Sequence, residues 1–123
     1  LGIFYAYWLL GLVLQWIFNP ISASADFGFV FNELTSDAQN ALLRDFTSFF
    51  VATFIFSILG AITLNPAWFF SAGIVYFGAG IFNLIAIYAH GTGFNQIFIS
   101  EFILGAWPTA LALTIIMKEQ KNI

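Results

Sequence analysis

The residues of this chain that could carry out chemistry are few, and they stand near the ends of apolar segments. Arg44 and Asp45 precede one apolar segment, His90 ends another, and Glu101 lies early in a third. His90 is the only histidine, and Glu101 is one of six acidic residues in a chain of 123. Ionisable groups at such positions, if the fold brings them together, can form an ion pair, a ligand site or a proton route.

The composition indicates that a lipid bilayer, rather than water, surrounds most of the chain. Hydrophobic residues make up 61% of the sequence and charged residues only 7%, whereas typical soluble domains are about 25% charged. A bilayer core about 30 Å thick requires about 20 apolar residues in a helix. We therefore predict an all-α transmembrane four-helix bundle, a single membrane domain over residues 1–123 with spans at 1–18, 46–64, 67–89 and 96–117.

Helix-start signals lie between these segments. Asn65 and Pro66 are suited to begin the third helix, because asparagine caps helices and proline is tolerated in the first turn. The run from Ser36 to Gln39 reads as a capping box with serine at the N-cap and glutamine at N3. The second helix is thus expected to begin near Asp37, outside the membrane, within an extramembrane connection over 20–45, and to run from there into the span.

Orientation follows from the placement of the basic residues. Lys118 and Lys121 follow the fourth segment directly, and Arg44 is the only other basic residue. The positive-inside rule then places the C-terminus in the cytoplasm, and four spans place the N-terminus there too. Segment 1–18 shows neither a positive n-region nor a small-residue cleavage site, so we expect it to be a retained span rather than a signal peptide.

The fourth segment carries its acidic residue on a face of small residues. One face of this segment carries residues at spacings of three and four: Glu101, Gly105, Pro108 and Ala112. Faces made of small residues are typical of helix packing in membranes. Glu101 is therefore expected to point into the bundle. Pro108 lacks an N–H and leaves the Leu104 carbonyl without its helical partner, which should kink the helix.

The turn expected at residues 91–93 brings His90 and Glu101 to the same side of the membrane. Arg44 is the only arginine and enters the second segment at that side, so we predict that it pairs with Glu101, directly or through one water. Asp45 would brace the guanidinium or point to water. The predicted polar cluster consists of Arg44, Asp45, His90, Glu101, Gln15 and Asn83.

Several roles remain open for this cluster. It can hold the helices together, form a cleft for a small ligand or lipid headgroup, or begin a proton or ion route. No polar residue continues such a route through the inner half of the membrane. His90, Asp45 and Glu101 are of metal-ligand type, but a lone histidine near a charged pair favours a structural role, so we predict no metal or cofactor. One histidine cannot supply bis-histidine haem ligation, which leaves haem shared with another subunit as an alternative. The absence of cysteine excludes disulfides and thiolate chemistry.

Four short motifs resemble those of a known family. These are FNPISASADFGF after the first segment, LRDF before the second, the His-Gly turn after the third and SEF early in the fourth. The chain resembles a family of small four-helix bacterial integral membrane proteins classified as a domain of unknown function. The resemblance implies a fold and a bacterial inner (plasma) membrane, but no activity. This chain has His90 and Asn83 where many members carry an acidic residue and an arginine.

The sequence favours a non-catalytic role. It has no nucleophile–base pair, phosphate loop or cofactor motif, and three basic against six acidic residues offer no nucleic-acid surface. The leading hypothesis is an accessory or structural subunit, whose partners are the lipid bilayer and other membrane protein subunits. The alternative is a small-ligand or lipid-binding membrane protein, or an enzyme, that uses the polar cluster.

Overall fold

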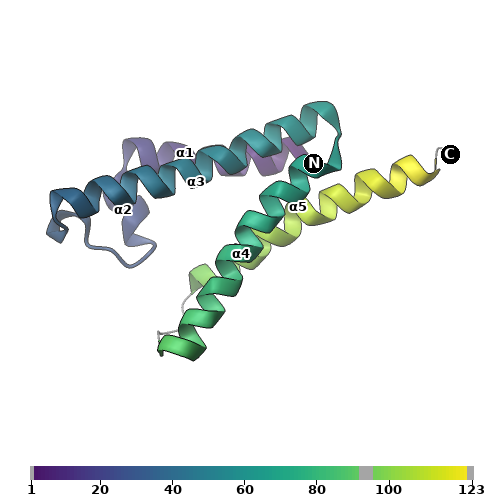
Figure 1. Ribbon diagram of the computed structural model, residues 1–123. Helices are drawn as coiled ribbons and strands as arrows, with labels where there is room; N and C mark the ends of the chain where they lie inside the picture. Colours follow the sequence, from purple (N-terminus) through teal and green to yellow (C-terminus); the bar gives the residue numbers. More distant parts are fainter. Residues whose placement is uncertain (1, 92–95, 122–123) are drawn as a thin grey trace.

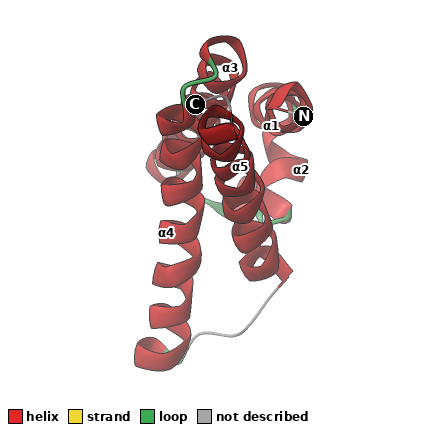
Figure 2. Ribbon diagram, turned by 90° about the vertical axis from the view of Figure 1, so that its right-hand side faces the viewer, coloured by secondary structure: helices red, strands yellow, loops and turns green. Residues whose placement is uncertain are grey.

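The protein is helical throughout the residues that the structure describes. The computed structural model describes residues 2–91 and 96–121, and Figure 1 shows their arrangement. The prediction of an all-α fold is confirmed for these residues, and Figure 2 shows only helices and connecting loops. The elements are α1 (Gly2–Phe18), α2 (Pro20–Ala25), a 3₁₀ turn η1 (Phe31–Glu33), α3 (Ser36–Thr63), α4 (Pro66–His90) and α5 (Gln96–Lys121).

Three of these helices are long and apolar enough to cross a membrane. They are α3, α4 and the part of α5 from Ile99 to Lys121. The apolar helix α1 has 17 residues, so it is shorter than the other three. Length and composition of the described residues therefore support a membrane-embedded protein with three candidate spans.

The start of α4 agrees with the sequence-based prediction. The Asn65 side chain accepts a hydrogen bond from the Ala67 amide at 3.1 Å, and Pro66 is the first helical residue. Asn19 and Pro20 separate α1 from α2 in the same way. Both asparagine–proline pairs thus mark a helix start because the asparagine oxygen satisfies an amide that the helix leaves unpaired.

The start of α3 differs by one residue from the predicted capping box. Thr35, not Ser36, is the N-cap, and its hydroxyl accepts from the Ala38 amide at 3.2 Å. The Gln39 side chain donates to the Phe31 carbonyl at 2.9 Å rather than to the N-cap amide. The glutamine therefore fastens η1 to α3, and the helix still begins outside the expected span.

The long helices form two pairs that meet at one end. α1 lies along α3, and α4 packs most extensively against α5. Leu64 joins α3 to α4 in the left-handed conformation, with φ of 54°. Figure 1 shows that α3 and α4 diverge from this connection, so the two pairs spread apart toward the N-terminal end of α3, near α2, and the C-terminal end of α4.

The crossing of α4 and α5 depends on glycine. A Cβ at Gly73 would lie 2.5 Å from the Thr109 hydroxyl and 3.2 Å from the Gly105 carbonyl. Gly105, Pro108 and Ala112 are buried, so the predicted small face of the fourth segment is the packing face. The backbones approach closely because these positions carry little or no side chain.

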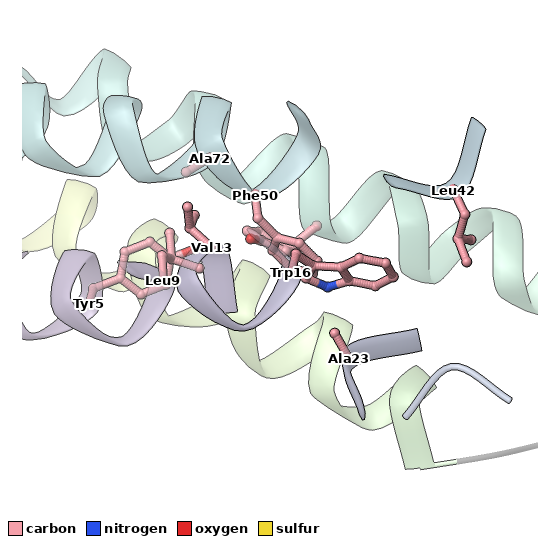
Figure 3. Close-up of a cluster of buried hydrophobic side chains, with 9 residues drawn as sticks. Tyr5, Leu9, Val13, Trp16, Ala23, Leu42, Phe50 and Ala72 are labelled. Atoms are coloured by element: carbon pink, nitrogen blue, oxygen red, sulfur yellow. The ribbon is translucent and has the colours of Figure 1, made fainter. Parts of the chain in front are cut away.

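The main core lies between α1 and α3. Figure 3 shows Trp16 beside Phe50, and the Trp16 ring stacks on Phe46 with centroids 4.8 Å apart. Two buried hydroxyls connect the pairs. Tyr5 donates to the Leu104 carbonyl at 2.8 Å, and the Tyr76 hydroxyl shares a 2.8 Å hydrogen bond with Thr53.

Candidate functional site

An open hollow of about 840 Å³ lies where the two helix pairs spread apart. Residues of α1, α2, α3, α4 and α5 line it, and we call it the inter-pair hollow. Its walls are mainly apolar, because aromatic rings from the connection and from α3 and α4 face it. These rings belong to Phe27, Phe46, Phe49, Phe50 and Tyr76.

Three carboxylates also line the inter-pair hollow. Asp26 follows α2, Asp45 belongs to α3 and Glu101 belongs to α5. The aspartates are exposed, whereas Glu101 is half-buried. No lysine, arginine or histidine occurs among the described lining residues, so this part of the surface is both aromatic and acidic.

Glu101 has one partner and one unmet hydrogen-bonding atom. The Asn83 side chain on α4 hydrogen-bonds to the Glu101 carboxylate. The Glu101 Oε2 atom is buried and has no hydrogen-bond partner among the residues that the structure describes. Buried polar atoms without a partner are rare in native proteins. The structure thus brings together the predicted site residues Asn83 and Glu101 and leaves one carboxylate oxygen for a further donor.

Arg44 does not form the direct ion pair with Glu101 that the sequence led us to predict. Its Nε donates to Asp45 Oδ1 at 2.9 Å, and its Nη2 lies 3.4 Å from Asp45 Oδ2. Both side chains are largely exposed, at 70% and 65%. Asp45 is the next residue along α3, so its carboxylate reaches the Arg44 guanidinium without the approach of another helix. The inter-pair hollow lies on the side of α3 that carries Phe46 and Phe49.

The two remaining predicted site residues lie at the periphery. The Gln15 side chain on α1 donates to Asp26 Oδ2 at 3.5 Å, a long hydrogen bond at the edge of the inter-pair hollow. His90 is the exposed last residue of α4, and Gly91 ends that helix with φ of 68°. Asp45 and Glu101 line the hollow, whereas His90, Gln15 and Arg44 do not.

Sequence reasoning missed two residues that position the site. Tyr5 satisfies the Leu104 carbonyl that Pro108 leaves free, and a proline within a buried helix was a signal that some donor must do so. Trp16 anchors Phe27 and Phe46, two rings of the hollow, at centroid distances of 5.9 and 4.8 Å. The stack on Phe46 had no signal in the sequence, because it depends on how α1 lies against α3.

The chemistry of this site is that of carboxylates and aromatic rings. The described residues contain no group of three histidine, cysteine or acidic side chains placed to hold a metal ion. A carboxylate with an amide partner can accept hydrogen bonds and attract a cation, and the faces of aromatic rings attract cations as well. The arrangement is therefore suited to binding.

The chain matches no protein-family model, no curated protein and no solved structure. The resemblance to the small four-helix bacterial family therefore stays a prediction, and the function must be argued from the site itself.

Proposed function

We propose that the protein is a non-catalytic integral membrane protein that binds a small amphipathic ligand in the inter-pair hollow. The observation that carries this proposal is the hollow itself. Its volume of about 840 Å³ falls in the range of about 300–1,000 Å³ that is usual for small-molecule sites. Its walls combine aromatic rings with a few polar groups, as such sites do.

In this proposal the chain crosses the bacterial inner membrane four times, with both termini in the cytoplasm. Helix α1, the first in the chain, is the span that is added to the three candidate spans α3, α4 and α5. Its 17 residues rise about 25 Å at 1.5 Å per residue, close to a hydrocarbon thickness of about 30 Å. It lies along α3, and its outward side chains are large and apolar. Ile3, Phe4, Tyr7 and Trp8 are all exposed.

The topology can be tested with single cysteines because the chain has none of its own. Cysteines at Val30 and Gln120 should be labelled from opposite sides of the membrane by an impermeant maleimide, with position 120 reached only from the cytoplasm. Labelling of both positions from the same side would rule out the proposed arrangement.

Ligand binding can be tested by filling the hollow. Ala79 lines the inter-pair hollow, whereas Ala110 is exposed on α5. Dodecyl amphiphiles should bind to the protein in lipid nanodiscs above the level of empty nanodiscs. Ala79→Trp should abolish this excess, and Ala110→Trp should leave it unchanged. No excess for an amphiphile of any charge, or an equal effect of the two tryptophans, would contradict the proposal.

The accessory subunit is the second candidate, and a different observation favours it. Tyr7 is 75% exposed on the outward side of α1, where lipid tails offer its hydroxyl no hydrogen-bond partner. A neighbouring subunit could supply one. A photoreactive residue at Tyr7 should then crosslink to another protein in native membranes, more strongly than one at Ile74, which is 71% exposed on α4. Lipid adducts alone at both positions would exclude this role for α1.

A further inference from the structure

The inter-pair hollow is an acidic site without an internal cation. Asp26 reaches it from the connection after α2, Asp45 from α3 and Glu101 from α5. Arg44, the nearest basic residue in the sequence, is held by Asp45 on the exposed surface and does not line the hollow. Arg44 therefore balances only Asp45, and neither Asp26 nor Glu101 has a basic partner among the described residues. A positively charged occupant would be complementary to this acidic lining.

The carboxylate of Glu101 calls for a hydrogen-bond donor. Its Oε2 atom is buried and unpartnered within the described part of the chain. Leaving such an atom without a donor is costly, and the cost is larger for a charged group. An ammonium group carries N–H donors and a positive charge, so beside the Glu101 carboxylate it would supply both a donor and a countercharge.

The aromatic wall supplies the rest of the recognition. Phe46 and Phe49 on α3 and Tyr76 on α4 face the same space as Glu101. The Phe49 and Tyr76 rings meet edge to face with centroids 5.0 Å apart, which fixes their orientation. Such rings offer apolar contact to a hydrocarbon tail and a negative face to an adjacent cation.

We propose that the ligand is an amphipathic organic cation, whose ammonium group hydrogen-bonds to Glu101 and whose apolar part packs among the aromatic rings of the inter-pair hollow. This assignment rests on the proposed binding function and specifies the chemical class of the ligand. The ammonium group can come from the headgroup of an aminophospholipid or from a free lipophilic amine.

The test compares three probes that share a tail and differ in headgroup: dodecylamine, dodecanol and dodecanoate. The protein is placed in phosphatidylcholine nanodiscs, because the quaternary ammonium of that lipid has no N–H to offer Glu101. We expect dodecylamine to bind at least about tenfold more tightly than dodecanol, which corresponds to about 1.4 kcal/mol. Dodecanoate should bind most weakly.

Two variants locate the preference. Glu101→Gln should reduce the amine-to-alcohol ratio to within about twofold, since a neutral amide pairs only weakly with an ammonium. Glu119→Gln makes the same change on the exposed C-terminal end of α5 and should leave the ratio unchanged. If Glu101→Gln does not fold, Ala79→Trp shows whether dodecylamine binds in the inter-pair hollow. This variant should reduce dodecylamine binding to the level of empty nanodiscs.

The outcomes separate the two levels of the proposal. Equal binding of all three probes would overturn the cation assignment and leave the binding function standing. No binding of any probe above empty nanodiscs would overturn both. Added phosphatidylethanolamine distinguishes the sources: competition with dodecylamine indicates a lipid headgroup, and its absence indicates a free amine. A preference that survives in Glu101→Gln would show that Glu101 is not the anchor.

Discussion

The hydrogen bond from Tyr5 to Leu104 allows a quantitative test of the fold. Pro108 has no N–H, so the Leu104 carbonyl lacks its helical donor, and the Tyr5 hydroxyl occupies that carbonyl at 2.8 Å. Tyr5 is fully buried, and its ring meets the Trp107 ring edge to face at 5.1 Å. Tyr5→Phe keeps this ring contact and removes only the donor.

The expected cost comes from the carbonyl that is left behind. Hydrogen bonds between membrane helices contribute about 0.6 kcal/mol on average and up to about 1.7, and an unsatisfied buried group costs about 1–3 kcal/mol. We therefore expect Tyr5→Phe to lower the free energy of unfolding by about 1–2 kcal/mol. Pro108→Ala restores an N–H to the helix, so in that background the same change should cost less than about 0.5 kcal/mol.

The measurement is a double-mutant cycle for unfolding in mixed detergent micelles. The cycle cancels the packing change that Pro108→Ala causes by itself, because that change is common to both backgrounds. The coupling between the two positions should be about 1 kcal/mol. Equal costs of Tyr5→Phe in the two backgrounds would refute the reasoning, since they would show that the hydroxyl does not replace the missing amide.

Three further variants test neighbouring contacts. Gly73→Ala should destabilise the protein by about 1–3 kcal/mol through overpacking, whereas Gly78→Ala, which meets nothing within 4 Å, should not; equal unfolding midpoints would contradict the close crossing. Tyr76→Phe should cost about 0.6 kcal/mol, less than Tyr5→Phe, because the threonine partner on α3 keeps its backbone carbonyl acceptors. Arg44→Gln and Asp45→Asn should each leave the unfolding midpoint unchanged, because their pair is exposed and solvent-screened; a clear loss would reveal a partner for Arg44 other than Asp45.

The helices could be predicted from the sequence because local signals specify them. Asn65 and Pro66 begin α4 as their backbone preferences require, and the small face that contains Gly105 is buried as its spacing predicts. The N-cap of α3 was predicted one residue late. Thr35 and Ser36 are both good caps, and the contact of Gln39 with η1, which favours the earlier one, is not local.

The partner of Glu101 could not be predicted in the same way. The sequence places Arg44 and Glu101 at the same end of the bundle, but it does not specify how far the helix pairs spread there. The spread opens the inter-pair hollow, and the nearest cation stays with Asp45, its neighbour in the chain. Asn83 reaches Glu101 instead, because α4 and α5 stay close near these residues, where the Phe77 and Phe102 rings lie 5.9 Å apart.

The contrast between Glu101 and the other buried polar groups carries the functional argument furthest. Thr53, Ser57, Tyr5 and Thr109 each donate to a backbone carbonyl. A bilayer offers no water to satisfy such groups, so a membrane helix must satisfy them internally. Within the described residues, Glu101 Oε2 is the one buried side-chain oxygen or nitrogen without a partner, and Glu101 also lines the inter-pair hollow. The fold therefore satisfies every other buried polar side chain of its described residues and leaves one acceptor on a residue that lines the hollow. An ammonium group would offer this carboxylate both a hydrogen-bond donor and a countercharge.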